Sequence, residues 1–92
     1  MRIPIRLDPD ETLTLLLSGT LNIGCVADCE RALALGRQLH KHVAIDLGKV
    51  RLIDRPMLQF LVDLTREDVA LTNCPDHVAR WMRLAAVDAP DD

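Results

Sequence analysis

The chain has 92 residues, enough for one domain, and a domain of this length buries only about 60–65% of the surface that its unfolded chain exposes. Apolar residues make up 49% of the sequence and charged residues 27%, a globular balance that excludes an intrinsically disordered chain. The net charge of −3 and the scarcity of aromatic residues argue against nucleic acid as a partner, because phosphate binding needs a basic excess and base stacking needs rings.

No apolar stretch approaches the roughly 20 residues that a membrane-spanning helix needs, so direct membrane insertion is not expected. Residues 1–6 also lack the apolar run of a secretion signal. Three cysteines form an odd set, which fits reduced thiols better than a disulfide framework. We therefore expect a cytoplasmic protein.

Two strands are predicted near the N-terminus, over residues 2–7 and 12–17, because apolar and polar residues alternate in both. Asp8–Glu11 separates them as a turn, so the two strands should pair in antiparallel fashion. Pro4 fits an edge strand, because it has no backbone N–H to donate to a neighbour. Residues 1–11 are thus expected to form an N-terminal strand and turn.

A β-α-β unit is predicted next along the chain. Ser18–Thr20 and Asn22–Gly24 interrupt the strand pattern. Apolar residues then recur every three or four positions and predict a helix from Val26 to about Leu39. Val43–Leu47 follows as a short, nearly all-apolar strand of the kind that parallel sheets bury on both faces.

A second helix is predicted over Pro56–Leu64, after the connecting residues Gly48–Arg51. Proline suits the first turn of a helix, where its missing N–H leaves no bond unmade, and either Asp54 or Arg55 precedes it as the cap. The helix is apolar on most sides, so we expect it to be heavily covered.

The last strand and helix are predicted at Val69–Thr72 and after Asn73–Asp76, where a capping side chain, a proline and an acid open a helix. Residues 88–92 are expected to be an acidic, flexible tail. The whole chain, residues 1–92, is predicted to be a single α/β domain of order ββαβαβα. Its four-stranded mixed sheet should have an antiparallel N-terminal edge strand and otherwise parallel strands.

Three short stretches, in this order and spacing, resemble the STAS family of bacterial anti-sigma-factor antagonists from about residue 13 to residue 84. Leu17–Asn22 is similar to the family's Leu-Ser-Gly-Glu-Leu-Asp. Ala44–Leu47 with Val50 and Ile53-Asp54 is similar to its Val-Leu-Asp-Leu-Ser-x-Val-x-x-Ile-Asp. Leu71–Asn73, followed by Pro75, Val78 and Arg80, is similar to its last strand and helix.

The resemblance implies a protein-binding module in which a partner anti-sigma kinase phosphorylates a hydroxyl directly after the Ile-Asp pair. Here the aligned residues are Arg55, Pro56 and Met57, none of which accepts phosphate, and Asn22 replaces an acid in the neighbouring loop. A phosphate would add about −1.5 to −2 charge at this point, whereas Arg55 adds a permanent positive charge.

The predicted function is therefore a non-enzymatic interaction module that is not switched by serine phosphorylation and needs no cofactor. The expected partner is a regulatory protein, either an anti-sigma-factor-like kinase or the ATPase subunit of an ABC-type membrane transporter. The predicted contact residues lie at one edge of the sheet: Asn22, Asp54, Arg55, Pro56 and Met57. The oligomeric state stays open.

Two alternatives of another class use the same region. Asp54 follows a parallel strand, as the phosphoacceptor of a receiver-like domain does, but the late lysine of such a site is missing. Cys25, Cys29, Cys74 and His77 have the ligand types of a Cys3His zinc site. Because Cys29 also lies on the predicted core stripe, a small apolar thiol explains it without a metal, and we expect none.

Overall fold

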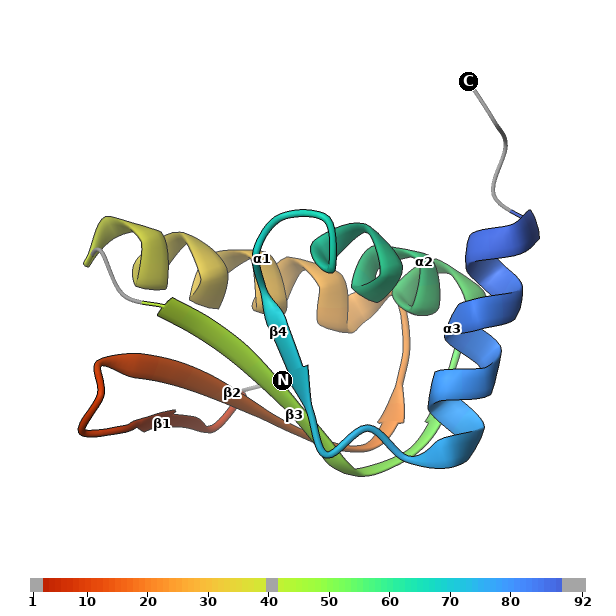
Figure 1. Ribbon diagram of the computed structural model, residues 1–92, viewed down its shortest axis with the longest axis horizontal. Helices are drawn as coiled ribbons and strands as arrows, with labels where there is room; N and C mark the ends of the chain where they lie inside the picture. Colours follow the sequence, from red (N-terminus) through yellow and green to blue (C-terminus); the bar gives the residue numbers. More distant parts are fainter. Residues whose placement is uncertain (1–2, 40–41, 89–92) are drawn as a thin grey trace.

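The computed structural model describes residues 3–39 and 42–88, the backbone alone for residues 87 and 88. Figure 1 shows the chain as one sheet with helices packed against it. The strands are β1 (Ile5–Leu7), β2 (Thr12–Leu21), β3 (His42–Ile53) and β4 (Ala70–Thr72), and the helices are α1 (Gly24–Gln38), α2 (Arg55–Leu64) and α3 (Asp76–Asp88). The predicted order ββαβαβα is confirmed. Residues 89–92 of the predicted tail lie outside the described residues, and Asp88 is the last residue of α3.

The sheet has the strand order β1-β2-β3-β4. Strand β1 pairs with β2 in antiparallel fashion, whereas β2–β3 and β3–β4 are parallel, as predicted. Helices α1 and α2 lie over one face of the sheet, and α3 packs beside α2 (Figure 1). In the described part of the chain, none of these helices is long and apolar enough to cross a membrane.

Strands β2 and β3 are longer than predicted, because both continue through residues that the sequence pattern assigned to breaks. Ser18–Thr20 belongs to β2 and Gly48–Arg51 to β3. Two bulges make this possible, since the register shifts between Leu16 and Ser18 and again between Gly19 and Thr20. Gly19 has a φ of 71°, a left-handed conformation that glycine adopts without steric cost. Polar and glycine residues thus bend the strand pair without ending it.

The core lies between the sheet and the helices and consists of aliphatic, methionine and cysteine side chains. Leu15, Ile45 and Leu61 are fully buried at its centre. Helix α1 approaches the sheet closely at Gly36, where an added Cβ would lie 2.6 Å from Cγ2 of Val43. A second, smaller cluster of Leu58, Val62 and Ala85 joins α2 to α3.

Candidate functional site

One edge of the sheet brings together the ends of β2 and β3 and the first turns of α1 and α2. Asp54, between β3 and α2, fixes this junction. Its Oδ1 accepts a hydrogen bond of 3.0 Å from the backbone N–H of Met57, which makes it the N-cap of α2. Its Oδ2 accepts a second bond of 2.9 Å from the backbone N–H of Ile23, 31 residues earlier. The carboxylate therefore holds the loop before α1 and the start of α2 in one fixed geometry.

The loop between β2 and α1 is also closed by the side chain of Asn22. Oδ1 of Asn22 accepts a hydrogen bond of 2.8 Å from the N–H of Gly24, and the Asn22 carbonyl accepts one of 2.8 Å from the N–H of Cys25. Such an Asx turn satisfies backbone donors that the first turn of a helix leaves without partners. A Cβ at position 24 would lie 2.9 Å from Asn22 Oδ1, so glycine suits this tight turn.

The predicted contact residues differ in what they offer to a partner. Asn22, Arg55 and Pro56 are exposed and Asp54 is half-buried. The side chain of Met57, however, is completely buried in the core. It points inward because it lies one helical turn before Leu61, which faces the sheet as well. The prediction that Met57 lies at the contact surface therefore needs correction, since only its backbone N–H, bonded to Asp54, belongs to this edge.

Two exposed apolar side chains at the same edge were not among the contact residues predicted from the sequence. Ile23 is 64% exposed and Leu52 is 57% exposed. A simple strand alternation places Leu52 inward with Val50, but the second bulge pairs Val50 with Gly19 and Leu52 with Thr20. Since Val50 and Leu52 pair with consecutive residues of β2, their side chains lie on opposite faces of the sheet. We call Asn22, Ile23, Leu52 and Asp54–Pro56 the Asp54 edge.

The four residues considered for zinc do not form a site in this structure. Cys25 and Cys29 lie on the buried side of α1, whereas Cys74 follows β4 and is partly exposed. Within the described ranges, no three His, Cys, Asp or Glu side chains come close enough to hold a metal ion. Burial, with smaller contributions from Cys25 and nearby carboxylates, raises the pKa of the Cys29 thiol to about 12. Cys29 is thus a core residue, as its place on the apolar stripe predicted.

His77 has a structural environment of its own. Its Nε2 lies 3.0 Å from the carbonyl oxygen of Arg51, which joins the first turn of α3 to the end of β3. Its ring meets the Trp81 ring edge-on, with centroids 5.1 Å apart. The contact with Arg51 places the start of α3 against the end of β3, and the contact with Trp81, one helical turn later on α3, orients the His77 ring.

The sequence matches no family model and no curated protein. Among solved structures, the chain is similar to the anti-sigma factor antagonist SpoIIAA in its unphosphorylated form. The TM-score is 0.69 at 13% sequence identity, and the match covers 89% of this chain and 82% of that one. The resemblance seen in the short sequence stretches is thus matched by the path of the backbone. The chain has the STAS-like fold of the anti-sigma factor antagonists.

Proposed function

We propose that this chain is a non-enzymatic protein-interaction module that binds a regulatory protein through the Asp54 edge. The observation that carries the proposal is the combination of a fixed backbone with exposed apolar side chains. The Asp54 side chain accepts hydrogen bonds from the loop before α1 and from the first turn of α2, and Ile23 and Leu52 are exposed nearby in the sequence of these segments. A preorganised apolar surface loses little entropy when a partner covers it, so it favours binding. The likeness of the fold to SpoIIAA, named as an anti-sigma factor antagonist, supports the same role.

Binding at this edge is proposed to proceed without a phosphorylation switch. Arg55 and Pro56, which occupy the first positions of α2, have no hydroxyl to modify. Both carboxylate oxygens of Asp54 accept backbone hydrogen bonds, so phosphorylation of one of them would disturb either the cap of α2 or the link to Ile23. Incubation of the purified chain with acetyl phosphate should therefore leave its mass unchanged. A phosphate adduct on Asp54 would favour the receiver-like alternative instead.

The contact surface is tested by affinity capture of partners from the native cell with the tagged full chain. Substitution Ile23→Ser removes an exposed apolar side chain without a buried cavity, so the fold should persist while partner recovery falls. Arg55→Glu tests the charge at the same edge. The matched control is Leu35→Ser on α1, where the side chain is 43% exposed. Equal recovery with Ile23→Ser and with Leu35→Ser would show that the Asp54 edge is not the contact surface.

The kind of partner follows from the proteins recovered. Recovery of an anti-sigma-factor-like kinase would assign the chain to control of transcription, and recovery of an ATPase subunit would assign it to an ABC-type membrane transporter. Both partners act from the cytoplasm, which is the proposed location of the chain. Genes beside the coding sequence offer an independent check, because a kinase gene and a transporter cassette distinguish the two assignments.

A further inference from the structure

Strand β1 forms one edge of the sheet, and no other strand or helix of the described residues lies along its outer side (Figure 1). A strand without a neighbour presents a row of N–H and C=O groups that can pair with a strand of another chain. Proteins often protect such an edge with a proline, and Pro4 comes directly before β1. The direction of each backbone group therefore decides whether this edge is open.

The hydrogen bonds between β1 and β2 use alternate residues. The C=O of Pro4 accepts a bond of 2.9 Å from the N–H of Leu16, and the N–H of Asp8 donates one of 2.9 Å to the first residue of β2. In an antiparallel pair, residues that bond to the neighbouring strand alternate with residues whose N–H and C=O point away from it. The backbone groups of Ile5 and Leu7 thus point outward. The N–H that Pro4 lacks would face β2, so this proline leaves the outer edge open.

The side chains along this outer edge are aliphatic and incompletely covered. Ile5 lies opposite Leu15 and Leu7 lies opposite Leu13, so all four point toward the face of the sheet that α1 and α2 cover. Leu15 and Leu13 are 0% and 4% exposed, whereas Ile5 and Leu7 are 43% and 59% exposed. The cover on this face therefore extends over β2 and stops before β1.

We propose that two copies of the chain pair through β1 in antiparallel fashion and form a weak dimer with two-fold symmetry. A two-fold axis at Ile5 places Ile5 opposite Ile5 of the second copy, and Leu7 opposite Ile3 of the second copy. Each of these pairs can exchange two N–H···O=C bonds, and each brings aliphatic side chains together. Such an interface uses the same surface on both copies, so the assembly closes after two chains.

The charges of β1 favour this axis over the neighbouring one. An axis at Arg6 would place the two Arg6 side chains directly opposite each other, and like charges in that position are destabilising. With the axis at Ile5, Arg6 lies opposite Pro4 of the second copy and keeps its ion pair of 2.9 Å with Asp8. A stable interface buries about 800 Å² on each chain, and an edge of about five residues, roughly 17 Å long, buries less. The dimer should therefore form only at high protein concentration.

Position 5 lies on the proposed axis, so changes of charge there test both the second copy and the register. Ile5→Lys and Ile5→Glu each place like charges opposite each other, and each should weaken self-association at least about fivefold. An equimolar mixture of the two variants should associate more tightly than either alone, because a lysine then faces a glutamate. Sedimentation equilibrium over a range of concentrations measures this. Ile5 is 43% exposed, so both variants should fold, and circular dichroism checks this.

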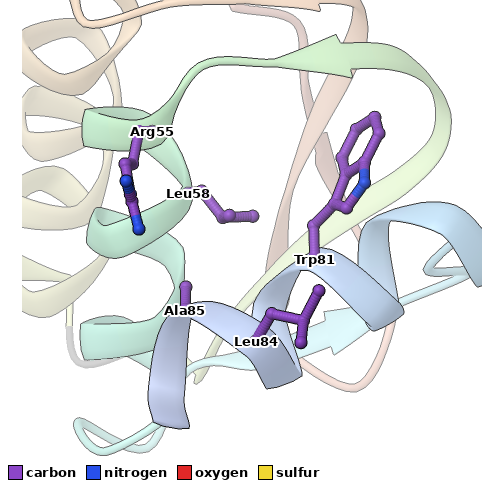
Figure 2. Close-up of a pocket in the computed structure, with 5 residues that line it drawn as sticks. All are labelled: Arg55, Leu58, Trp81, Leu84 and Ala85. Carbon is purple, nitrogen blue, oxygen red and sulfur yellow. The ribbon is translucent and has the colours of Figure 1, made fainter. Parts of the chain in front are cut away.

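The matched control is the same pair of substitutions at Leu84, another exposed apolar residue. Leu84 is 57% exposed and lies on α3, beside the small hollow between α2 and α3 that Figure 2 shows. Strand β1 and helix α3 lie at opposite sides of the molecule (Figure 1). Charges separated by more than about 8 Å are largely screened at physiological salt, so Leu84→Lys and Leu84→Glu should change self-association less than about twofold.

Three results would overturn the proposal: a chain that stays monomeric up to about 1 mM, equal effects of the substitutions at Ile5 and Leu84, or a mixture of the Ile5 variants that associates no better than either alone. Loss of partner recovery with Ile5→Lys, in a chain that stays monomeric, would instead assign this edge to a strand of another protein. Each of these results leaves the proposed function to its own test, because Ile23 lies outside β1.

Discussion

The two ends of the strand pair β2–β3 are held to their helices by different kinds of interaction. At the Asp54 edge, a side-chain carboxylate accepts hydrogen bonds from one backbone N–H in the loop before α1 and one in the first turn of α2. At the opposite end, α1 is held by the close approach of Gly36 to Val43, and an exposed ion pair joins Arg37 to Glu67. The Asp54 edge is thus fixed by hydrogen bonds from the side chains of Asp54 and Asn22 to the backbone. Arg55 and Pro56 occupy the first positions of α2 at this edge.

Asp54→Ala should have the largest effect of the substitutions that test how the two ends of β2–β3 are held. This substitution removes the cap of α2 and leaves the N–H groups of Ile23 and Met57 without their acceptor. A lost N-cap costs about 1 kcal/mol and a lost bond to a charged group about 1.5 kcal/mol or more. We therefore expect the free energy of unfolding to fall by about 2–3 kcal/mol in urea denaturation.

Asp54→Asn is the matched control, because one of its side-chain oxygens is kept. The asparagine carbonyl can still accept from Met57, whereas its NH2 group cannot accept from Ile23. Asp54→Asn should therefore lose only about half as much free energy of unfolding as Asp54→Ala. If Asp54→Asn were as stable as the parent chain, the link to Ile23 would contribute nothing, and the edge would be fixed by helix capping alone.

The opposite end is tested by Gly36→Ala. An added Cβ would lie 2.6 Å from Cγ2 of Val43, and the branched valine side chain has little rotational freedom to move away. Overpacking costs about 1–3 kcal/mol, and the better helix propensity of alanine returns up to about 1 kcal/mol. A net loss of about 1 kcal/mol is expected in thermal or urea unfolding.

A double-mutant cycle with Val43→Ala identifies the cause of that loss. If the clash is responsible, the double variant should be more stable than the sum of the two single losses predicts. Additive losses would mean that contact with the Val43 side chain is not the cause of the loss, and that close packing does not hold this end.

The order of elements and the cap of α2 could be predicted from the sequence, because both depend on local patterns. Asp54 followed by Pro56 is a helix-opening pattern, and the structure selects Asp54 over Arg55 as the cap. The alternation in β2 and the apolar run in β3 likewise predicted the parallel pair. Local chemistry was sufficient wherever neighbours in sequence decide the conformation.

The rest of the edge depends on contacts between residues far apart in the chain, which a local pattern cannot show. The bond from Ile23 to Asp54 joins positions 31 residues apart. The bulges that turn Leu52 outward arise from the pairing of β3 with β2. In the sequence alone, their glycine and polar residues indicate the ends of strands. Met57 was expected at the contact surface because it aligns with the segment after the family's Ile-Asp pair, although the helical phase of α2 turns it inward.

A smaller effect is expected at Asp46, beside the first bulge of β2–β3. Its Oδ1 accepts from the N–H of Gly48 at 2.8 Å, and its Oδ2 accepts from Nδ2 of Asn73 at 3.0 Å. The bond from Gly48 is the main cause that lowers the pKa of Asp46 below its ordinary value of 3.8, and the bond from Asn73 adds to it. The ionised form is therefore the one that stabilises the folded chain.

For a carboxyl group whose pKa is lowered on folding, the stabilisation is present above the unfolded value and is lost as the pH falls through the folded value. Asp46→Asn should therefore reduce stability at neutral pH, and its difference from the parent chain should shrink once the pH falls below 3.8. Urea unfolding of the variant and the parent chain, at neutral pH and at a pH below 3.8, measures this difference in stability. A difference that is the same at both would show that the charge of Asp46 is irrelevant to the bulge.

The smallest effect is expected from Arg37→Ala at the end opposite the Asp54 edge. Nη2 of Arg37 lies 3.0 Å from Oε1 of Glu67, and the two side chains are 56% and 53% exposed. Water and salt screen such a pair, and ordering two long side chains costs entropy, so the loss should stay below about 0.5 kcal/mol. Urea unfolding at low and high salt should give nearly equal values for the variant and the parent. A loss of the size expected for Asp54→Ala would show that ion pairing holds this end as firmly as the carboxylate holds the other.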